Sequence, residues 1–299
     1  MQKPTPGHPV DLARNIRLLL APNPGPMTHW GTNTYLLGND QIAVIDPGPD
    51  NDAHFQAILD ATKGATITHI LVTHAHADHS PLAARLSQVT SAPVMGFGPA
   101  EAGRSDVMQR LAQANLLEGG EGVDTSFRPD MTLRDGDVVE GTDWHLGILH
   151  TPGHFAGHLS FAYGTEIFSG DHVMDWASTL ISPPDGDLGA FMATCHMLKE
   201  RNPNKLFPGH GAPIVAVKDR LAWLISHRKA RETAILKVLK PAALTVTEIT
   251  AQVYTDVPPK VLPAAARNVF AHLIDLVERK LITASPELST KAQFHFAKV

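Results

Sequence analysis

Residues 73–79, Thr-His-Ala-His-Ala-Asp-His, place four potential metal ligands within six positions. The segment follows the apolar run Ile70-Leu71-Val72. His74, His76 and Asp78 are spaced two residues apart, and alternate residues of an extended segment share a face. The spacing therefore predicts that these three side chains converge on one point. Imidazole and carboxylate ligands together favour zinc or a similar first-row divalent ion.

The elements that must position this segment are a strand before it and a helix after it. Apolar residues over 66–73 predict the strand. Pro81 precedes Leu-Ala-Ala-Arg-Leu, and proline is favoured in the first turn of a helix. The ligands, including His79, are thus expected in a tight loop between the two elements.

Three further candidate ligands follow short apolar strands later in the chain. Each predicted strand ends in a turn that contains Pro or Gly, and glycine lets backbone segments approach closely. The strands are expected at residues 144–149, 166–169 and 205–207. The turns present His154, Asp171 and His210 in that order. We expect these three side chains to meet the 73–79 segment along one edge of a sheet sandwich.

Size and composition predict a globular protein. The chain has 299 residues, enough for one large domain or a large and a smaller one, and is 43% hydrophobic. We find no apolar stretch near the ~20 residues of a membrane span and no signal peptide core. The single cysteine, Cys195, excludes an internal disulfide and favours a reducing cytoplasm. We expect a cytoplasmic protein without a membrane partner, with Cys195 as a packing residue.

Charge is divided unevenly along the chain. Residues 218–299 hold 13 Lys and Arg against 7 Asp and Glu, whereas residues 1–217 hold 12 against 23. The asymmetry predicts two parts, and a basic part can favour nucleic acid. A solvated surface of ordinary helices explains the same charges at least as well.

Four motifs together resemble the metallo-β-lactamase superfamily, in the order of that family and over roughly residues 15–215. They are Thr-His-Ala-His-Ala-Asp-His (73–79), Thr-Pro-Gly-His (151–154), Ser-Gly-Asp (169–171) and Pro-Gly-His-Gly (208–211). The resemblance implies an α+β fold, a four-layer αββα sandwich with a metal site at one edge. It also implies the ligands: His74, His76 and His154 for one metal, Asp78, His79 and His210 for the second, and Asp171 bridging both.

Further stretches resemble the β-lactamase-like protein 2 branch, which carries a winged-helix C-terminal domain. They are Gly-Thr-Asn-Thr-Tyr (31–35), Trp-Ala-Ser-Thr (176–179) and Ser-Pro-Pro-Asp-Gly-Asp-Leu (182–188). The resemblance implies a catalytic domain over residues 1–216 and a winged-helix-like domain over 217–299. The tail fits, with helices predicted at 217–240, from Thr245 and at 263–280, and a wing hairpin from 281–284 and 294–296. Thr245 and Glu248 have capping-box spacing.

Such a site supports hydrolysis. Two metal ions roughly 3.5–4 Å apart can hold a bridging hydroxide at neutral pH and clamp both ends of a displacement. Asp78 is placed to bind metal and to steer or accept the proton of the nucleophile. We expect two Zn²⁺ per chain, with Fe or Mn as alternatives, and an ester, thioester or lactone-type small molecule as substrate.

Two other functions stay open. The branch resemblance implies single-stranded RNA as an alternative substrate for a metal-dependent endoribonuclease, and the basic tail is compatible with phosphate contacts. The winged helix also permits a metal-sensing DNA-binding regulator, or a docking or homodimer role. In di-iron oxidoreductase relatives Glu fills the position of His76, so His argues against that subgroup.

Several residues near the motifs have open roles. Asp46 either caps a loop, which we favour, or supports a ligand from behind. His158 is a candidate support for the ligands, His172 is expected to be structural or to reach substrate, and His29 could line the cleft. Residues 100–125, with a helix expected around 107–117, form a long connection of the kind that often covers a site.

Overall fold

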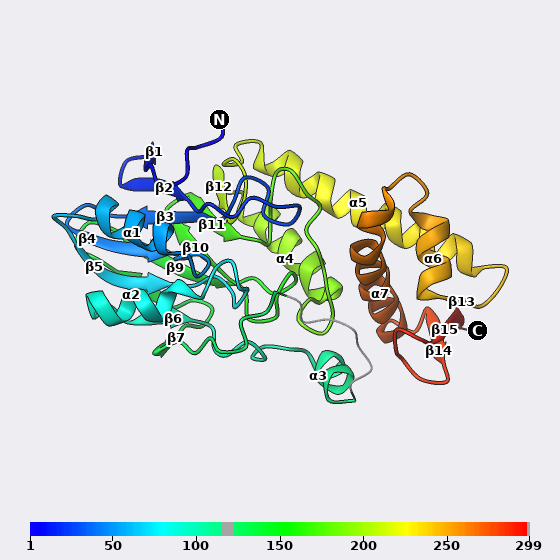
Figure 1. Ribbon diagram of the computed structural model, residues 1–299. Coiled ribbons are helices and arrows are strands. Elements are labelled where there is room, and N and C mark those ends of the chain that lie inside the picture. Colours follow the sequence, from blue (N-terminus) through cyan, green and yellow to red (C-terminus); the bar gives the residue numbers. More distant parts are fainter. Residues whose placement is uncertain (115–121, 298–299) are drawn as a thin grey trace.

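The chain folds into a layered sandwich followed by a smaller C-terminal lobe (Figure 1). The computed structural model describes residues 1–114 and 122–297. Two β-sheets face each other, and helices cover the outer face of each. The predicted α+β class and four-layer αββα architecture are therefore confirmed, as is the winged-helix lobe.

The first sheet follows the order of the chain, from β1 to β7. Its strands are β1 (Val10–Ala13), β2 (Ile16–Leu20), β3 (Asn33–Leu37), β4 (Gln41–Ile45), β5 (Thr66–Leu71), β6 (Val94–Gly96) and β7 (Met131–Thr132). Pairing is antiparallel from β1 to β4 and parallel from β4 to β7. Helices α1 (Asp52–Ala61) and α2 (Leu82–Thr90) cover its outer face.

Strand β4 shows why the first sheet lies in the middle of the protein. Ile42 and Val44 pack outward with α1 and α2, whereas Ala43 and Ile45 pack inward between the sheets. All four are buried. Because successive side chains of a strand point to opposite faces, a strand that is covered on both sides is apolar throughout.

The second sheet has the spatial order β12-β11-β10-β9-β8. Its strands are β8 (Val138–Glu140), β9 (His145–His150), β10 (Leu159–Tyr163), β11 (Glu166–Gly170) and β12 (Lys205–Pro208). Helix α4 (Leu188–Arg201) joins β11 to the parallel strand β12 and packs on the outer face. Asp187 caps this helix, with its carboxylate accepting the backbone N–H of Ala190 at 3.0 Å. Cys195 of α4 is fully buried in this core.

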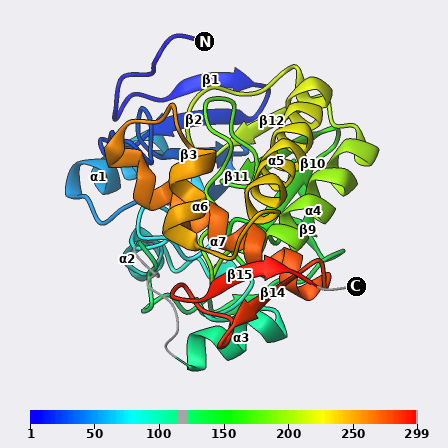
Figure 2. The same cartoon turned by 90° about the vertical axis from the view of Figure 1, so that its right-hand side faces the viewer.

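The C-terminal lobe carries the predicted winged-helix elements (Figure 2). They are α5 (Val217–Leu239), β13 (Leu244–Thr245), α6 (Val246–Val253), η1 (Pro259–Val261), α7 (Leu262–Glu278), β14 (Ile282–Ser285) and β15 (Gln293–Phe296). The wing is the antiparallel pair β14–β15. The capping box at the start of α6 is confirmed, with reciprocal contacts between Thr245 and Glu248.

Helix α5 belongs to both cores. Leu221 and Leu224 pack with α4 against the second sheet, whereas Ile235 and Leu239 pack inside the C-terminal lobe. The expected boundary between residues 216 and 217 therefore stays a prediction, placed at the start of a helix that ties the two parts together. Within the described ranges, no helix is both long and apolar enough to cross a membrane.

The long connection after β6 contains helix α3 (Asp106–Gln113). Its Val107, Met108 and Leu111 pack with the C-terminal lobe. The helix begins near the predicted position, and residues 115–117 of the prediction lie outside the described residues. The connection thus anchors the sandwich to the lobe as well as passing the site.

Candidate metal centre

The predicted ligands come from four loops that meet at one edge of the sandwich. The loop after β5 carries residues 74–79, and the turn after β9 carries His154. Asp171 directly follows β11, and His210 follows β12. The expectation that separate strand ends would bring these side chains together agrees with the structure.

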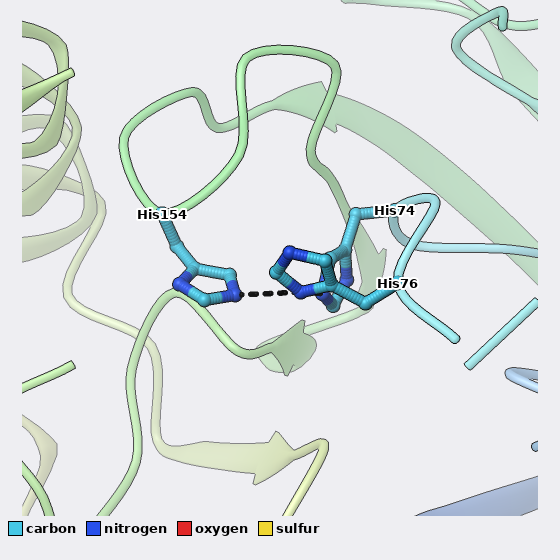
Figure 3. A group of neighbouring side chains, drawn as sticks. All are labelled: His74, His76 and His154. Carbon is cyan, nitrogen blue, oxygen red and sulfur yellow. Dashed lines mark hydrogen bonds between the residues drawn. The ribbon is translucent and has the colours of Figure 1, made fainter. Parts of the chain in front are cut away.

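The first group consists of His74, His76 and His154 (Figure 3). His74 Nε2 lies 2.8 Å from His76 Nδ1, and His154 Nε2 lies 3.1 Å from the same nitrogen. Figure 3 shows the His154 ring approaching the other two from a separate loop. These ring nitrogens converge closely enough to hold one cation.

The second group consists of Asp78, His79 and His210. His210 Nε2 lies 3.1 Å from Asp78 Oδ2, and His79 Nε2 lies 3.4 Å from the same oxygen. The prediction that Asp78 converges with His74 and His76 on one point is therefore wrong. The chain leaves β5 at Leu71 and turns after His76, so the alternation of an extended strand does not apply there.

Asp171 lies between the two groups. Its Oδ2 is 3.3 Å from His210 Nε2 and 3.8 Å from His154 Nε2, and its Oδ1 is 3.5 Å from His79 Nε2. One carboxylate thus faces histidines of both groups, which is the position that the bridging role requires. Metal binding by these seven side chains remains a prediction.

The far ring nitrogens of two histidines are held by backbone carbonyls. His154 Nδ1 donates to the Leu180 carbonyl at 2.7 Å, and His210 Nδ1 donates to the Gly31 carbonyl at 3.1 Å. A carbonyl can only accept, so Nδ1 carries a proton and Nε2 is the ring nitrogen left to face the site. In both residues Nε2 points toward the other candidate ligands.

Asp46 supports two further histidines, His79 directly and His74 through Thr73. His79 Nδ1 donates to Asp46 Oδ2 at 2.9 Å. The Thr73 hydroxyl donates to the same oxygen at 2.8 Å and lies 2.9 Å from His74 Nδ1, from which it must accept. The Thr73 backbone N–H donates to Asp46 Oδ1 at 2.7 Å. Asp46 therefore supports two candidate ligands from behind, in addition to the loop capping that we favour for it.

Sequence reasoning missed the support that Asn33 gives to the His210 loop. Its Nδ2 donates to the carbonyls of Pro208 and Gly211, both at 2.9 Å, and its backbone N–H donates to the Gly209 carbonyl at 2.8 Å. The Thr32 hydroxyl also lies 3.2 Å from Asp78 Oδ2. The signal available in the sequence was the polar run Thr32-Asn33-Thr34 at the start of the otherwise apolar strand β3.

The first group is neutral at physiological pH. Burial lowers the pKa of His74 and His154 below the ordinary histidine value. For His76, burial followed by the neighbouring His154 lowers the pKa to about 3. Neutral imidazoles keep their lone pairs, which is the form that binds a metal ion.

In the metal-free protein the histidines and aspartates of the second group, together with Asp171, are charged. Burial alone would lower the pKa of His79, but the carboxylates of Asp78 and Asp171 raise it well above its ordinary value. Burial is likewise overcome at His210, whose pKa Asp171 raises to about 10. Burial would raise the pKa of both aspartates, but the two histidines hold it well below the usual range. The protons on His79 and His210 therefore balance the charges of Asp78 and Asp171, as a bound cation would.

Two buried atoms test whether a metal fits. His79 Nε2 and Asp171 Oδ1 have no hydrogen-bond partner among the described residues. Buried polar atoms are normally paired, so these two call for a further partner. Imidazole and carboxylate donors that converge around such atoms suit a divalent first-row ion. The residues present therefore fit a metal centre.

The remaining histidines surround the centre. His158 packs its ring 5.2 Å from that of His74 and contacts the Thr151 hydroxyl through Nδ1 at 2.8 Å. His172 is fully buried beside Phe191 and has a structural position. His29 stacks on Trp176, so it supports the cleft wall from behind.

A pocket of about 480 Å³ opens over the centre. Ligand side chains of both groups form part of its lining, and most of its walls are apolar. The walls include Met27, Met174, Trp176, Leu180, Val261 and Ala264. The last two belong to η1 and α7, so the C-terminal lobe closes one side. Gly122 and Val123 also line it, while residues 115–121 of the expected covering segment lie outside the described residues.

Comparison with known proteins identifies relatives. Residues 27–210 match the model of the metallo-beta-lactamase superfamily, and residues 245–287 match the beta-lactamase associated winged helix domain. A Caenorhabditis elegans protein named beta-lactamase-like protein 2 homolog is 31% identical over 265 residues, covering 86% of this chain and 82% of the relative. The atrochrysone carboxyl ACP thioesterase of Claviceps purpurea is 23% identical over 252 residues, covering 80% and 71%.

Solved structures share the fold. A beta-lactamase domain protein from Burkholderia ambifaria superposes with a TM-score of 0.80 at 21% identity, covering 98% of this chain and 95% of that one. TTHA1623, solved in a di-iron-bound form, gives a TM-score of 0.50 at 28% identity and covers 66% and 96%. From the matched family models and the C. elegans relative, this chain belongs to the metallo-beta-lactamase superfamily of metal-dependent hydrolases, in the branch with a C-terminal winged helix.

Proposed function

We propose that the protein is a dinuclear zinc hydrolase that cleaves an ester, thioester or lactone-type small molecule. The observation that carries the proposal is the placement of both ligand groups under a pocket with largely apolar walls. An apolar pocket with a few convergent polar groups is the usual form of a small-molecule site. The apolar part of the substrate would lie along these walls with its carbonyl over the ligands.

Two divalent ions held there would polarise that carbonyl and supply hydroxide at neutral pH. The side chain of Asp78 is 26% exposed, whereas that of Asp171 is 8% exposed. Asp78 therefore faces the pocket more openly and is the better placed carboxylate to steer water and accept its proton. The Thr32 hydroxyl and His210 hold Asp78 Oδ2 on this side.

A thioester substrate has further support. The Claviceps purpurea relative is named as a thioesterase that acts on a carboxyl ACP. The likeness extends over 80% of this chain. We therefore place acyl thioesters first among the substrate classes to test.

Zinc is the metal we propose, with Fe or Mn as alternatives. The proposed ligands are five histidines and two aspartates, and neutral imidazole with carboxylate is a usual zinc donor set. The di-iron form of TTHA1623 keeps iron open for this fold. Elemental analysis of the protein as isolated decides between them.

Single-stranded RNA is the alternative substrate, supported by the basic composition of residues 218–299. The pocket favours the small molecule, because its described lining includes Arg267 and no lysine. RNA binding in a groove depends on several cationic contacts to the backbone. A regulatory role that only senses metal has no comparable support from the pocket.

The deciding experiment is a panel of aryl esters, acyl thioesters, lactones and end-labelled single-stranded RNA. Each is assayed with and without a chelator, using wild type, Asp78→Ala and, as a matched surface control, Asp52→Ala. We expect chelator-sensitive thioester or ester cleavage by wild type and Asp52→Ala, and its loss in Asp78→Ala. Cleavage of RNA alone would establish the alternative, and equal activity of all three proteins would refute both.

A further inference from the structure

The loop after Asp171 forms one wall of the pocket and also supports a predicted ligand. Residues 171–187, all of them described, contain neither helix nor strand. Trp176 and Leu180 line the pocket, and the Leu180 carbonyl accepts the Nδ1–H of His154. Without ladder hydrogen bonds of its own, the loop depends on other elements to keep this carbonyl in place.

Arg228 of α5 provides such a hold. Arg228 is almost fully buried, with only 2% of the residue exposed. Nη2 donates to the carbonyls of Ser178, at 2.8 Å, and Thr179. Nη1 donates to Asn268 Oδ1 at 2.9 Å. Burying a guanidinium costs free energy unless its N–H groups are hydrogen-bonded. Arg228 therefore keeps these bonds, and they hold the two loop carbonyls in place.

Asn268 of α7 completes the hold from the other side. Its Oδ1, which accepts from Arg228, also accepts the backbone N–H of Ile181 at 3.1 Å. Leu180 therefore lies between two residues, Thr179 and Ile181, that are both tied to the C-terminal lobe. The orientation of the Leu180 carbonyl follows from these two attachments.

A second arginine of α5 holds the start of the same loop. Arg220 Nε donates to the Met174 carbonyl at 2.7 Å, and its Nη2 donates to the Ala177 carbonyl. The loop is thus attached to α5 at two places one after the other. On the facing side, Val261 and Ala264 line the pocket close to Asn268, which lines it too.

We infer that the winged-helix lobe is a working part of the active site, with Arg228 and Asn268 as positioning residues for His154. They act through the backbone of residues 178–181 and are not among the candidate metal ligands. The inference rests on the proposed function, because it assumes that His154 is a ligand. The lobe then sets both the geometry of the first ligand group and one wall of the pocket.

The test compares two disruptive variants, Arg228→Met and Asn268→Leu, with the conservative variants Arg228→Lys and Asn268→Asp. Asp at position 268 keeps an oxygen for both donors. Ile249→Ala is the stability control, because Ile249 is fully buried in the lobe core on α6, away from the loop. Two quantities are measured: hydrogen exchange of amides 174–182 in metal-free protein, and Zn²⁺ affinity by competition with a chromophoric chelator.

We expect faster exchange across 174–182 and about tenfold weaker binding of one of two zinc ions in both disruptive variants, since lost support of a ligand histidine typically weakens metal binding 10–100-fold. Asn268→Asp should keep most of the wild-type zinc affinity, and Arg228→Lys should keep part of it. Ile249→Ala should lower the melting temperature and change neither quantity. If Arg228→Met does not fold, Asn268→Leu carries the same test.

Wild-type exchange and wild-type zinc affinity in Asn268→Leu or in folded Arg228→Met would overturn the inference. Equal loss in Ile249→Ala would overturn it too, because general loosening of the lobe would then suffice. Failure of the wild type to bind zinc or another first-row ion would instead refute the proposed function. The two failures are therefore distinguishable.

Discussion

Asp46 Oδ2 accepts the Nδ1–H of His79 at 2.9 Å, although the two residues are 33 positions apart. The same oxygen accepts the Thr73 hydroxyl, which in turn accepts from His74. One carboxylate therefore orients a histidine of each ligand group. Asp46 has a positive φ of 51°, a backbone conformation that costs energy outside glycine and is kept where surrounding contacts require it.

We expect Asp46→Asn to damage the centre almost as much as Asp46→Ala. Both carboxylate oxygens receive donors, so an amide NH₂ would oppose either the Thr73 backbone N–H or the His79 ring N–H. Affinity for zinc should fall roughly 10–100-fold, measured by chelator competition. Asp46→Asn with wild-type affinity would show that the carboxylate does not orient His79.

Asp78→Ala should remove one metal and most of the activity. Its Oδ2 faces His79 and His210, so the second group loses its carboxylate. We expect metal content to fall from two ions per chain to about one, and kcat to fall by roughly 10²–10⁴-fold, the usual worth of a positioned proton acceptor. His76→Ala is the comparison, since it empties the first group instead. Elemental analysis with kinetics checks both, and full metal content in Asp78→Ala would contradict the assignment.

Gly209→Ala should disrupt the centre through shape alone. A Cβ at position 209 would collide with the carboxylate of Asp171 and lie 2.7 Å from the His79 ring. Neither side chain can move without leaving its ligand position, so we expect loss of metal binding with little change in charge. The control is Gly147→Ala, because Gly147 has no left-handed backbone and a Cβ there meets nothing closer than 3.8 Å. Normal zinc binding by Gly209→Ala would argue against this packing.

Ala264→Phe should shorten the pocket without touching the ligands. Ala264 lines the wall that α7 contributes. A larger side chain there should raise KM for long acyl substrates several-fold or more and leave short ones nearly unchanged, because it fills the side of the pocket that the C-terminal lobe closes. Metal content should stay at the wild-type value. An equal effect on short and long substrates would place the acyl group elsewhere.

Acid should destabilise the metal-free protein through His272 of α7. Burial, with Arg228 nearby, lowers the pKa of His272 from 6.5 to about 3. Between these values the unfolded chain binds a proton that the folded chain does not, so stability falls as the pH falls through this window. Neither ring nitrogen has a hydrogen-bond partner among the described residues.

Replacing His272 by Leu removes this dependence. The free energy of unfolding of the variant relative to wild type should be greater at pH 5 than at pH 7.5 by roughly 2 kcal/mol. Urea denaturation in the presence of a chelator at both pH values measures the difference. An offset that is the same at both pH values would show that His272 titrates normally in the folded protein.

Local patterns were sufficient to predict the elements and the candidate ligands. The strand before the ligand segment, the helix after Pro81 and the capping box of α6 depend on neighbours within a few residues. The ligand types at strand ends are equally local, which is why His154, Asp171 and His210 could be named in advance. The resemblance of these motifs to a known family supplied the layer order.

Only the tertiary structure decided how these residues work together. A turn after His76 sends Asp78 to the second group, against the simple alternation of a strand. Asp46 supports His79 across 33 residues, and Arg228 reaches Thr179 across 49. Such contacts depend on how separate layers pack against each other, and no short stretch of sequence contains both partners. For that reason the sequence by itself determined which side chains could do the chemistry, while packing of the sandwich against the lobe decided which atoms face one another.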